Sequence, residues 1–312
     1  MNLSFLSLTK NAEAAETIAK KITEKHNLSA SLVRILEGSQ LVFLLNDSLV
    51  LKIFNPDDEL FFQNEVLFLQ QLFGKLPIKT PKLILSDYEE NLPYLIMQKL
   101  EGVPLNKVWE TISYAQKSEL LYQLGTIVKE YHHLPKNRFT NTTHPWSPFI
   151  RDQKENLVKN HTNFGVNMEL IDQIIKWVNI HSSDLSNSED IVPLHTELML
   201  EHIFVEQTGD KWSITGLIDF EPAMLGHREY DFAAVGVFIC PGDPHLFRQF
   251  MLGYGYKPEK LTPSFSRRIM SWLLLHRYCN LTWFCKSVPK NIPSNNLESL
   301  HDYWYAIKSN HL

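Results

Sequence analysis

Residues 194–205 read LHTELMLEHIFV, and residues 214–221 read ITGLIDFE. The first stretch places acidic and imidazole side chains in a loop that leads into a β-type segment. A Thr-Gly-Asp turn at residues 208–210 precedes a second β-type segment, residues 213–220, which ends near Asp219. Such a hairpin can bring the loop and the strand end towards one point. The side chains that would meet there are His195, Glu197, His202 and Asp219.

These side chains match what phosphoryl transfer requires. One carboxylate must orient the attacking hydroxyl group, and two further ligands must hold magnesium against the phosphates. A polar loop before an ordinary hairpin would show similar residues, because carboxylates also gather at turns by chance. A metal-dependent hydrolase is another alternative, since this residue set suits zinc, but HTELMLEH is not the HExxH motif.

Two residues upstream favour a kinase. Lys52 lies in a β-type segment, and Glu65 follows thirteen residues later inside a predicted helix, residues 57–72. Kinase folds use a strand lysine paired to a helix glutamate to hold the lysine against nucleotide phosphates. The turn around Ser39 could cover the phosphates with backbone N–H groups, although the chain has no GxxxxGK[ST] motif. A lone lysine is also common on the exposed face of an alternating strand.

The first hundred residues predict a small antiparallel sheet with one helix packed on it. Apolar spacing predicts helices at residues 9–26 and 57–72, the first capped by Thr9 or Asn11. The predicted strands are residues 32–36, 41–45, 49–54, 81–86 and 94–99.

Residues 101–104, Glu-Gly-Val-Pro, break this pattern, and the chain beyond them becomes mainly helical, beginning with residues 114–133. We therefore expect an N-terminal nucleotide-binding part, residues 1–100, and a C-terminal catalytic and substrate-binding part, residues 101–312. In a two-lobed kinase the segment at the junction binds adenine through backbone groups. Gln98 and Leu100 would supply them here.

Composition limits the classes of partner. The chain has 312 residues and a net charge of −5, which gives no electrostatic reason to expect nucleic acid or an anionic membrane. This charge is compatible with a cationic acceptor. Three cysteines without a CxxC pair predict a reducing, cytoplasmic setting, and no run reaches the ~18 apolar residues of a membrane span. Oligomeric state has no sequence signal.

The quoted motifs resemble the aminoglycoside phosphotransferase and choline kinase-like family. That family shows a strand, then HGDxHxxN, then a hydrophobic strand and IDW or IDF. Residues 226–233, GHREYDFA, resemble its following GDPxYDLA segment. A weaker likeness to the hygromycin-B kinase branch rests on five residues. They are Trp146, Phe149, Gln153, His161 and Gly165.

The resemblance implies an α+β, two-lobed protein kinase-like fold and a small-molecule kinase. It would transfer the γ-phosphoryl group of ATP or GTP, with Mg²⁺, to a hydroxyl of an aminoglycoside-like or other amino or sugar alcohol. By position, Glu197 would be the base and Asp219 the main metal ligand, with Lys52 as phosphate clamp. His195 matches a loop histidine whose main role in the family is to hold backbone. Antibiotic resistance would be an analogy only.

Four residues differ from the family pattern. Glu197 replaces its catalytic aspartate, and His202 replaces its metal-binding asparagine. Thr196 and Met199 replace its glycine and second histidine. Magnesium prefers oxygen ligands, whereas imidazole suits manganese or zinc, so Mn²⁺ is an alternative metal.

These differences support a second hypothesis, a pseudokinase that binds nucleotide or ligand without transfer. Against it, both replacements retain a carboxylate and a metal-binding atom. The nearby acidic residues Glu201, Glu221 and Glu229 read as solvated loop carboxylates that could attract an amine.

Overall fold

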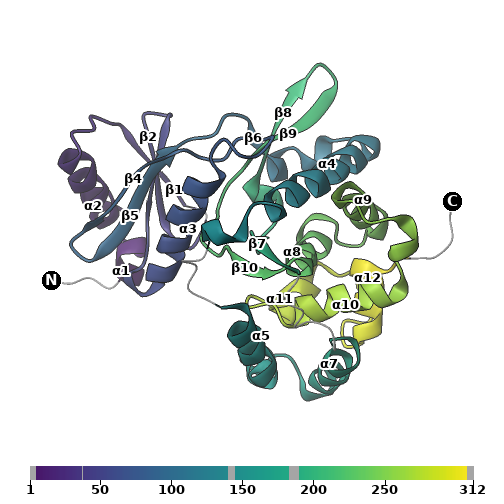
Figure 1. The fold of residues 1–312 in the computed structure, drawn as a ribbon. Helices are drawn as coiled ribbons and strands as arrows, with labels where there is room; N and C mark the ends of the chain where they lie inside the picture. Colours follow the sequence, from purple (N-terminus) through teal and green to yellow (C-terminus); the bar gives the residue numbers. More distant parts are fainter. Residues whose placement is uncertain (1–4, 37, 140–144, 183–189, 308–312) are drawn as a thin grey trace. The chain divides into compact units, whose positions relative to one another are not determined.

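The computed structural model describes residues 5–36, 38–139, 145–182 and 190–307 (Figure 1). The chain divides into two compact units. The first comprises Met1–Gly102 and Gly216–Ala223, and the second comprises Val103–Thr215 and Met224–Leu312. The segment that carries Asp219 therefore belongs to the first unit, although it follows more than a hundred residues of the second.

The first unit contains a five-stranded antiparallel sheet in the order β1-β2-β3-β5-β4. Asn46 and Asp47 connect β2 to β3, and both have positive φ, the conformation of a tight hairpin turn. The strands are β1 (Leu32–Ile35), β2 (Leu41–Leu45), β3 (Leu49–Ile53), β4 (Leu83–Glu89) and β5 (Leu92–Gln98). The predicted small antiparallel sheet is confirmed.

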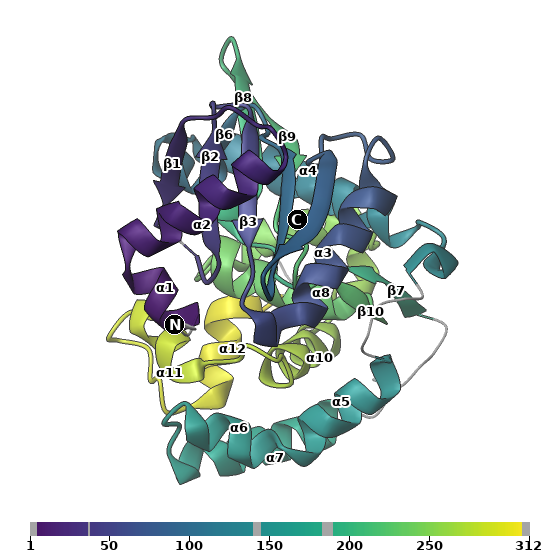
Figure 2. The same cartoon turned by 90° about the vertical axis from the view of Figure 1, so that its left-hand side faces the viewer.

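Helices cover both faces of this sheet, which corrects the expectation of a single packed helix. Helices α1 (Phe5–Lys10) and α2 (Ala12–Lys25) share one apolar core with β2, β3 and β5 (Figure 2). Side chains alternate along a strand, so Leu51 and Ile53 face α2 while Lys52 faces the opposite way, towards α3 (Glu59–Leu72). Amphipathic spacing gave no sign of which helix would take which face.

The predicted helix at residues 9–26 is in fact two helices. The chain breaks at Asn11, whose side chain accepts a hydrogen bond from the N–H of Ala14 at 3.0 Å and caps α2. Asn11 is one of the two caps that the sequence predicted, the other being Thr9. The short α1 before it was not predicted, because six residues are too few for a clear periodic pattern.

The second unit is mainly helical. Two small ladders accompany the helices: β7 (Ile191–Leu194) with β10 (Met224–His227), and β6 (Val103–Pro104), β8 (Ile203–Thr208) and β9 (Lys211–Leu217). The last two residues of β9 belong to the first unit. The longest helix of the second unit is α4 (Tyr114–His132). The other helices are α5 (Trp146–Glu155), α6 (Leu157–Asn163), α7 (Met168–His181), α8 (Glu229–Ala234), α9 (Pro244–Tyr254), α10 (Pro263–Leu274), α11 (Leu281–Phe284) and α12 (Leu297–Tyr305).

The two units together give the α+β class that the sequence predicted. One boundary matters for the site: β9 ends at Leu217, before the predicted end of that strand at residue 220, so Asp219 lies in the following loop. Within the described ranges, no helix combines the length and the apolar character that a membrane crossing requires.

Candidate active site

Lys52 lies at the centre of a charged cluster in the first unit. Its Nζ atom is 2.6 Å from Glu65 Oε2, 2.6 Å from Asp219 Oδ1 and 2.8 Å from Glu221 Oε2. Lys52 and Glu65 are buried, and the side chains of Asp219 and Glu221 are 25% and 13% exposed. Strand β3, helix α3 and the loop after β9 thus place one ammonium group among three carboxylates.

The three carboxylates decide the protonation state of Lys52. Burial opposes the positive charge, but Asp219, Glu65 and Glu221 outweigh it and raise the Lys52 pKa well above its ordinary value. Burial raises the pKa of Glu65 to about 7, although Lys52 acts in the opposite direction. The lysine is therefore charged at neutral pH, as a phosphate-binding group must be.

The same cluster fits a hard divalent cation. One ligand oxygen from each of Glu65, Asp219 and Glu221 lies within 4.8 Å of the others, and the set contains no nitrogen or sulfur. Glu65 Oε1 is buried without a hydrogen-bond partner in the described part of the chain. Because Mg²⁺ prefers oxygen ligands and three carboxylates exceed the charge of one lysine, the donor set suits Mg²⁺.

The loop of Asp219 is held by the rest of the first unit. The N–H of Leu217 donates to the Lys79 carbonyl at 3.1 Å, and Phe220 stacks on Phe68 with ring centroids 6.3 Å apart. Asp219 itself has φ +70°, which is uncommon for a residue other than glycine. Backbone of this kind concentrates at functional sites, where the surrounding structure holds it.

The proposed catalytic loop of the second unit is anchored by Asp231. The buried Asp231 carboxylate accepts hydrogen bonds from the N–H groups of His195 (3.0 Å) and Thr196 (2.6 Å). The hydroxyl of Tyr131 and Nε2 of His132 also donate to it. Burial opposes ionisation of Asp231, but His132 and Tyr131 outweigh it and lower the Asp231 pKa.

His276 holds the same loop from the opposite side of the peptide. Its Nε2 lies 3.0 Å from the carbonyl oxygen of Thr196, and burial lowers the His276 pKa to about 3. His276 is therefore neutral and donates through Nε2. Thr196 has φ +71°, so the position where the family pattern has glycine is a left-handed one that threonine rarely adopts.

His195, Glu197 and His202 lie together beyond this anchor. The N–H of Glu197 donates to Nδ1 of His195 at 3.3 Å, and Nδ1 of His202 lies 2.8 Å from the Glu197 carbonyl oxygen. With Nδ1 directed at that carbonyl, Nε2 is the His202 nitrogen that would ligate a metal. The rings of His195 and His202 have centroids 5.9 Å apart. The second unit thus brings three of the predicted residues together.

The remaining predicted residues belong to the first unit. Ser39 is exposed in the turn between β1 and β2. Gln98 ends β5, with its N–H on the Lys82 carbonyl at 2.9 Å, and Leu100 is buried two residues later. None of these contacts involves the Lys52 cluster.

Two acidic residues do not behave as solvated loop carboxylates. Glu221 contacts Lys52, as described above. Glu229 is buried, accepts two hydrogen bonds from Arg268 at 2.7 Å each, and accepts another from Trp272 Nε1 at 3.2 Å. Glu229 therefore fixes α8 to α10 and is not available to attract an amine. The Asp-x-Glu spacing of Asp219 and Glu221 was a signal that sequence reasoning could have used.

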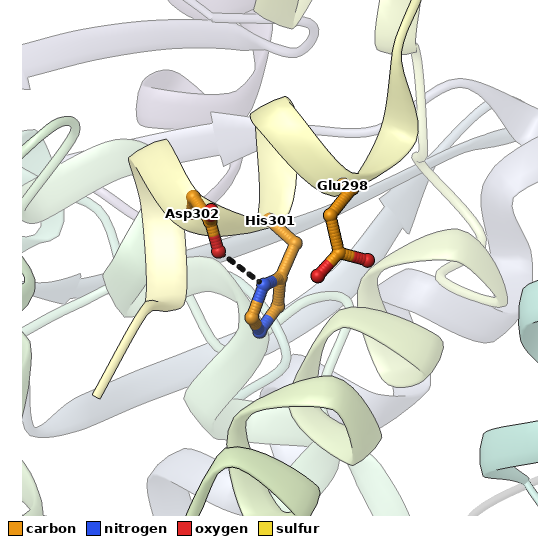
Figure 3. A group of neighbouring side chains, drawn as sticks. All are labelled: Glu298, His301 and Asp302. Carbon is orange, nitrogen blue, oxygen red and sulfur yellow. Dashed lines mark hydrogen bonds and ion pairs between the residues drawn. The ribbon is translucent and has the colours of Figure 1, made fainter. Parts of the chain in front are cut away.

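A second group of side chains that could ligate a metal lies on α12 (Figure 3). Residues of α10 contact this group. Glu298, His301 and Asp302 have ligand atoms within 4.8 Å of one another. Arg267 already contacts both oxygens of Glu298, and the His301 ring uses one nitrogen on Asp302 (3.1 Å) and the other on Ser266 (2.9 Å). This cluster joins two helices and has no ligand atom to spare on its histidine.

Comparisons with known proteins concern the family and the fold of the chain. The family model described as the phosphotransferase enzyme family, APH, matches residues 32–264. A search of curated proteins gave no match. Among solved structures, a GDP complex of wild-type aminoglycoside 2'-phosphotransferase-IIIa is 17% identical with a TM-score of 0.71, covering 92% of this chain and 97% of that chain.

Two further structures show the same fold. The streptomycin-ATP-APH(2")-IIa ternary complex is 16% identical with a TM-score of 0.62, covering 96% of this chain and 99% of that one. Macrolide 2'-phosphotransferase MphH from Brachybacterium faecium, an apoenzyme, is 16% identical with a TM-score of 0.60, covering 92% and 98%. The fold is thus the kinase-like one of aminoglycoside and macrolide phosphotransferases. With three quarters of its length matched by the family model, the chain belongs to the phosphotransferase enzyme family and is a phosphotransferase whose acceptor is an alcohol group.

Proposed function

We propose that the protein is a small-molecule kinase that moves the γ-phosphoryl group of ATP or GTP to a hydroxyl of an amino or sugar alcohol. The observation that carries this proposal is the buried contact of Lys52 with Glu65 and Asp219, at 2.6 Å each. A strand lysine held in this way is charged and positioned, as binding to nucleotide phosphates requires. Family membership supports the same reaction.

Each residue has a distinct role in this proposal. Lys52 binds phosphate oxygens of the nucleotide, and Glu65 fixes the position of its ammonium group. Asp219 and Glu221 would hold Mg²⁺, which neutralises charge on the phosphates. His202 is proposed as a further metal ligand, for which Mn²⁺ is better suited than Mg²⁺. Ser39, Gln98 and Leu100 are proposed to contact the nucleotide through their backbone.

Glu197 is the proposed base. The acceptor oxygen attacks the γ-phosphorus, its proton passes to the Glu197 carboxylate, and the bond from the γ-phosphorus to the bridging oxygen breaks to release the nucleoside diphosphate. Asp231 and His276 hold the backbone at Thr196, so the residue after it starts from a fixed position. Because the backbone ahead of Glu197 is held in place, we favour an active catalytic loop over the pseudokinase alternative.

The test is phosphoryl transfer followed by mass spectrometry. Wild-type protein is mixed with ATP or GTP, with Mg²⁺ or Mn²⁺, and with a pooled set of hydroxyl acceptors that includes aminoglycosides. Glu197→Gln should reduce transfer at least about a hundredfold while nucleotide binding persists, because the base is lost but the phosphate site is intact.

Glu201→Gln is the matched control, because Glu201 is an exposed carboxylate on the same loop. It should leave transfer unchanged. Unchanged transfer in Glu197→Gln would reject the assigned base. Nucleotide binding by the wild type without any phosphorylated acceptor would favour the pseudokinase instead.

A further inference from the structure

A cavity of about 480 Å³ opens in the second unit, lined by α5, α6 and the segment after α10. Its size lies in the range of small-molecule sites. Amide side chains dominate its wall: Gln153, Asn156, Asn160 and Asn163. Amides donate and accept hydrogen bonds, so they suit a ligand that carries several hydroxyl groups.

Arg277, on the same wall, is a positioned cation. The centre of its guanidinium group lies 5.2 Å from the ring centroid of Phe149 and 5.8 Å from that of Tyr278. The main-chain N–H of Arg277 donates a hydrogen bond to the Tyr230 hydroxyl at 3.0 Å. Aromatic faces on the guanidinium and a fixed backbone leave the side chain little freedom, which lowers the entropy cost of binding a ligand.

The guanidinium of Arg277 has no carboxylate partner among the residues that the structure describes. Its Nη2 contacts the sulfur of Met224, a weak acceptor, and its Nε is buried without a hydrogen-bond partner in those residues. A buried donor without an acceptor costs free energy, and an anion that reached this donor would remove that cost. Arg268, in contrast, has a carboxylate partner, since its Nε lies 2.7 Å from Glu229 Oε2.

The charge of the wall also favours an anion. Lys159 and Arg277 face a single acidic lining residue, Asp152. Asp152 already accepts a hydrogen bond from Asn156 at 2.9 Å. A polycationic amino sugar would be repelled by two positive side chains and attracted by one carboxylate. A ligand with a negative group would be attracted by the two and repelled by the one.

The chain links this wall directly to the proposed catalytic loop. Arg277 follows His276, so their Cα atoms are about 3.8 Å apart. The His276 ring donates to the carbonyl of Thr196, the residue before Glu197. Arg277 is therefore one residue along the chain from the histidine that holds the backbone ahead of the proposed base.

We infer that this cavity is the acceptor site and that the acceptor, besides its hydroxyl groups, carries an anionic oxygen group, a carboxylate or a phosphate, which Arg277 binds. The inference rests on the proposed function, because it takes the ligand to be the phosphoryl acceptor. It specifies the acceptor further, as an alcohol that also carries a carboxylate or a phosphate group.

The inference is tested by calorimetric binding of matched probes to the full-length protein without nucleotide. One pair is D-gluconate and D-glucitol, which differ in the carboxylate, and the other is ribose 5-phosphate and ribose, which differ in the phosphate. Kanamycin serves as the polycationic probe. We expect one anionic probe to bind at least about tenfold more tightly than its uncharged partner, since a charged hydrogen bond is the difference. Which pair shows the preference identifies the group.

Arg277→Gln should abolish this preference, and Arg277→Lys should restore part of it, because lysine keeps the charge without the planar fork. Arg248→Gln is the control, since it makes the same charge change at another cavity of the unit and should alter nothing. Equal affinity within both pairs, tighter binding of kanamycin, or an unchanged preference in Arg277→Gln would overturn the inference. Anion preference without transfer to any acceptor would instead reject the proposed function.

Discussion

At the scale of single residues, the cluster around Lys52 is the most sensitive part of the protein. Glu65 is buried, and its pKa is raised to about 7 by that burial, so its charge changes in the physiological range. When Glu65 is protonated, Lys52 loses one of the carboxylates that fix its ammonium group. Phosphate binding by Lys52 should therefore depend on pH through Glu65 as well as through the nucleotide.

Glu65→Gln should reduce kcat/KM for nucleotide roughly tenfold at pH 8, where the wild-type carboxylate is ionised and positions Lys52. At pH 6 the loss should be much smaller, because the wild-type side chain is itself largely protonated below a pKa of about 7. The pH profile of kcat/KM for both proteins measures this. Glu16→Gln, an exposed carboxylate of the same unit, controls for the loss of charge. A loss that is equal at both pH values would contradict the role of ionised Glu65.

Asp231 is the second residue on which the site depends. Its carboxylate accepts the N–H groups of His195 and Thr196 and two side-chain donors, so every one of its contacts requires an acceptor. An asparagine there would turn an N–H₂ group towards at least one donor. This explains how threonine can be held at φ +71° at position 196: its peptide neighbours are fixed by a charged, buried acceptor.

Asp231→Asn should lower the free energy of unfolding by about 3 kcal/mol, because a buried charged network loses its acceptor. Denaturant unfolding with urea measures it. Asp243→Asn is the matched control: Asp243 caps α9 by accepting from the N–H of Leu246, and asparagine caps equally well. A change below 1 kcal/mol in Asp231→Asn would show that the anchor contributes little.

At the scale of elements, α4 and α9 pack tightly against each other in the second unit. A Cβ atom built on Gly253 would lie 1.9 Å from the carbonyl oxygen of Tyr122, and one built on Gly125 would lie 2.1 Å from that of Phe250. Both obstacles are backbone atoms, which cannot rotate away. The hydroxyl of Thr126 adds a hydrogen bond to the Gly253 carbonyl at 3.3 Å. The two glycines therefore set the distance between the helices that carry Tyr131 and Tyr254.

Gly253→Ala should destabilise the protein by roughly 2–3 kcal/mol, even though alanine favours helix more than glycine does, because the helices must separate. Thermal unfolding of Gly253→Ala beside Glu119→Ala, an exposed position on α4, measures the difference. The control should change stability by less than about 0.5 kcal/mol. Stabilisation of Gly253→Ala would mean that the contact relaxes freely.

How much of this could be predicted from the sequence also differs by element. Strand β2 has the predicted bounds, and α3 and α4 differ from theirs by one or two residues, because alternating and helical apolar spacing is strong in these segments. The Lys52–Glu65 contact was predicted from the strand lysine and helix glutamate that kinase folds pair, and the structure contains it. The ion pair of buried Glu229 with the half-buried Arg268 was missed, since the residues are 39 apart and neither carries a local pattern. The placement of helices on both sheet faces was missed for the same reason.

At the scale of the whole molecule, buried histidines make the protein sensitive to acid. Burial lowers the pKa of His132, His161, His276 and His301, and that of His276 falls to about 3. Each is neutral in the folded protein and hydrogen-bonded to a neighbour. The unfolded chain binds protons at these residues with the ordinary histidine pKa near 6.5, so it gains protons that the folded protein does not.

The sign follows from this difference: a lowered pKa contributes stability that is complete above pH 6.5 and is lost as the pH falls towards 3. His276 alone should cost up to about 1.4 kcal/mol per pH unit in this window, and the other buried histidines add to it. The free energy of unfolding, measured in urea from pH 7 to pH 5, should therefore fall steeply. In His276→Gln the slope should be shallower, although the absolute stability is lower as well. His245→Gln, at an exposed histidine, controls for the loss of an imidazole. The slope of the free energy of unfolding against pH depends on the difference in bound protons between the unfolded and folded states, whereas lost contacts shift the whole curve. Parallel curves for wild type and His276→Gln would therefore show that His276 is protonated in the folded protein. That result would also remove the neutral donor that holds Thr196 ahead of Glu197.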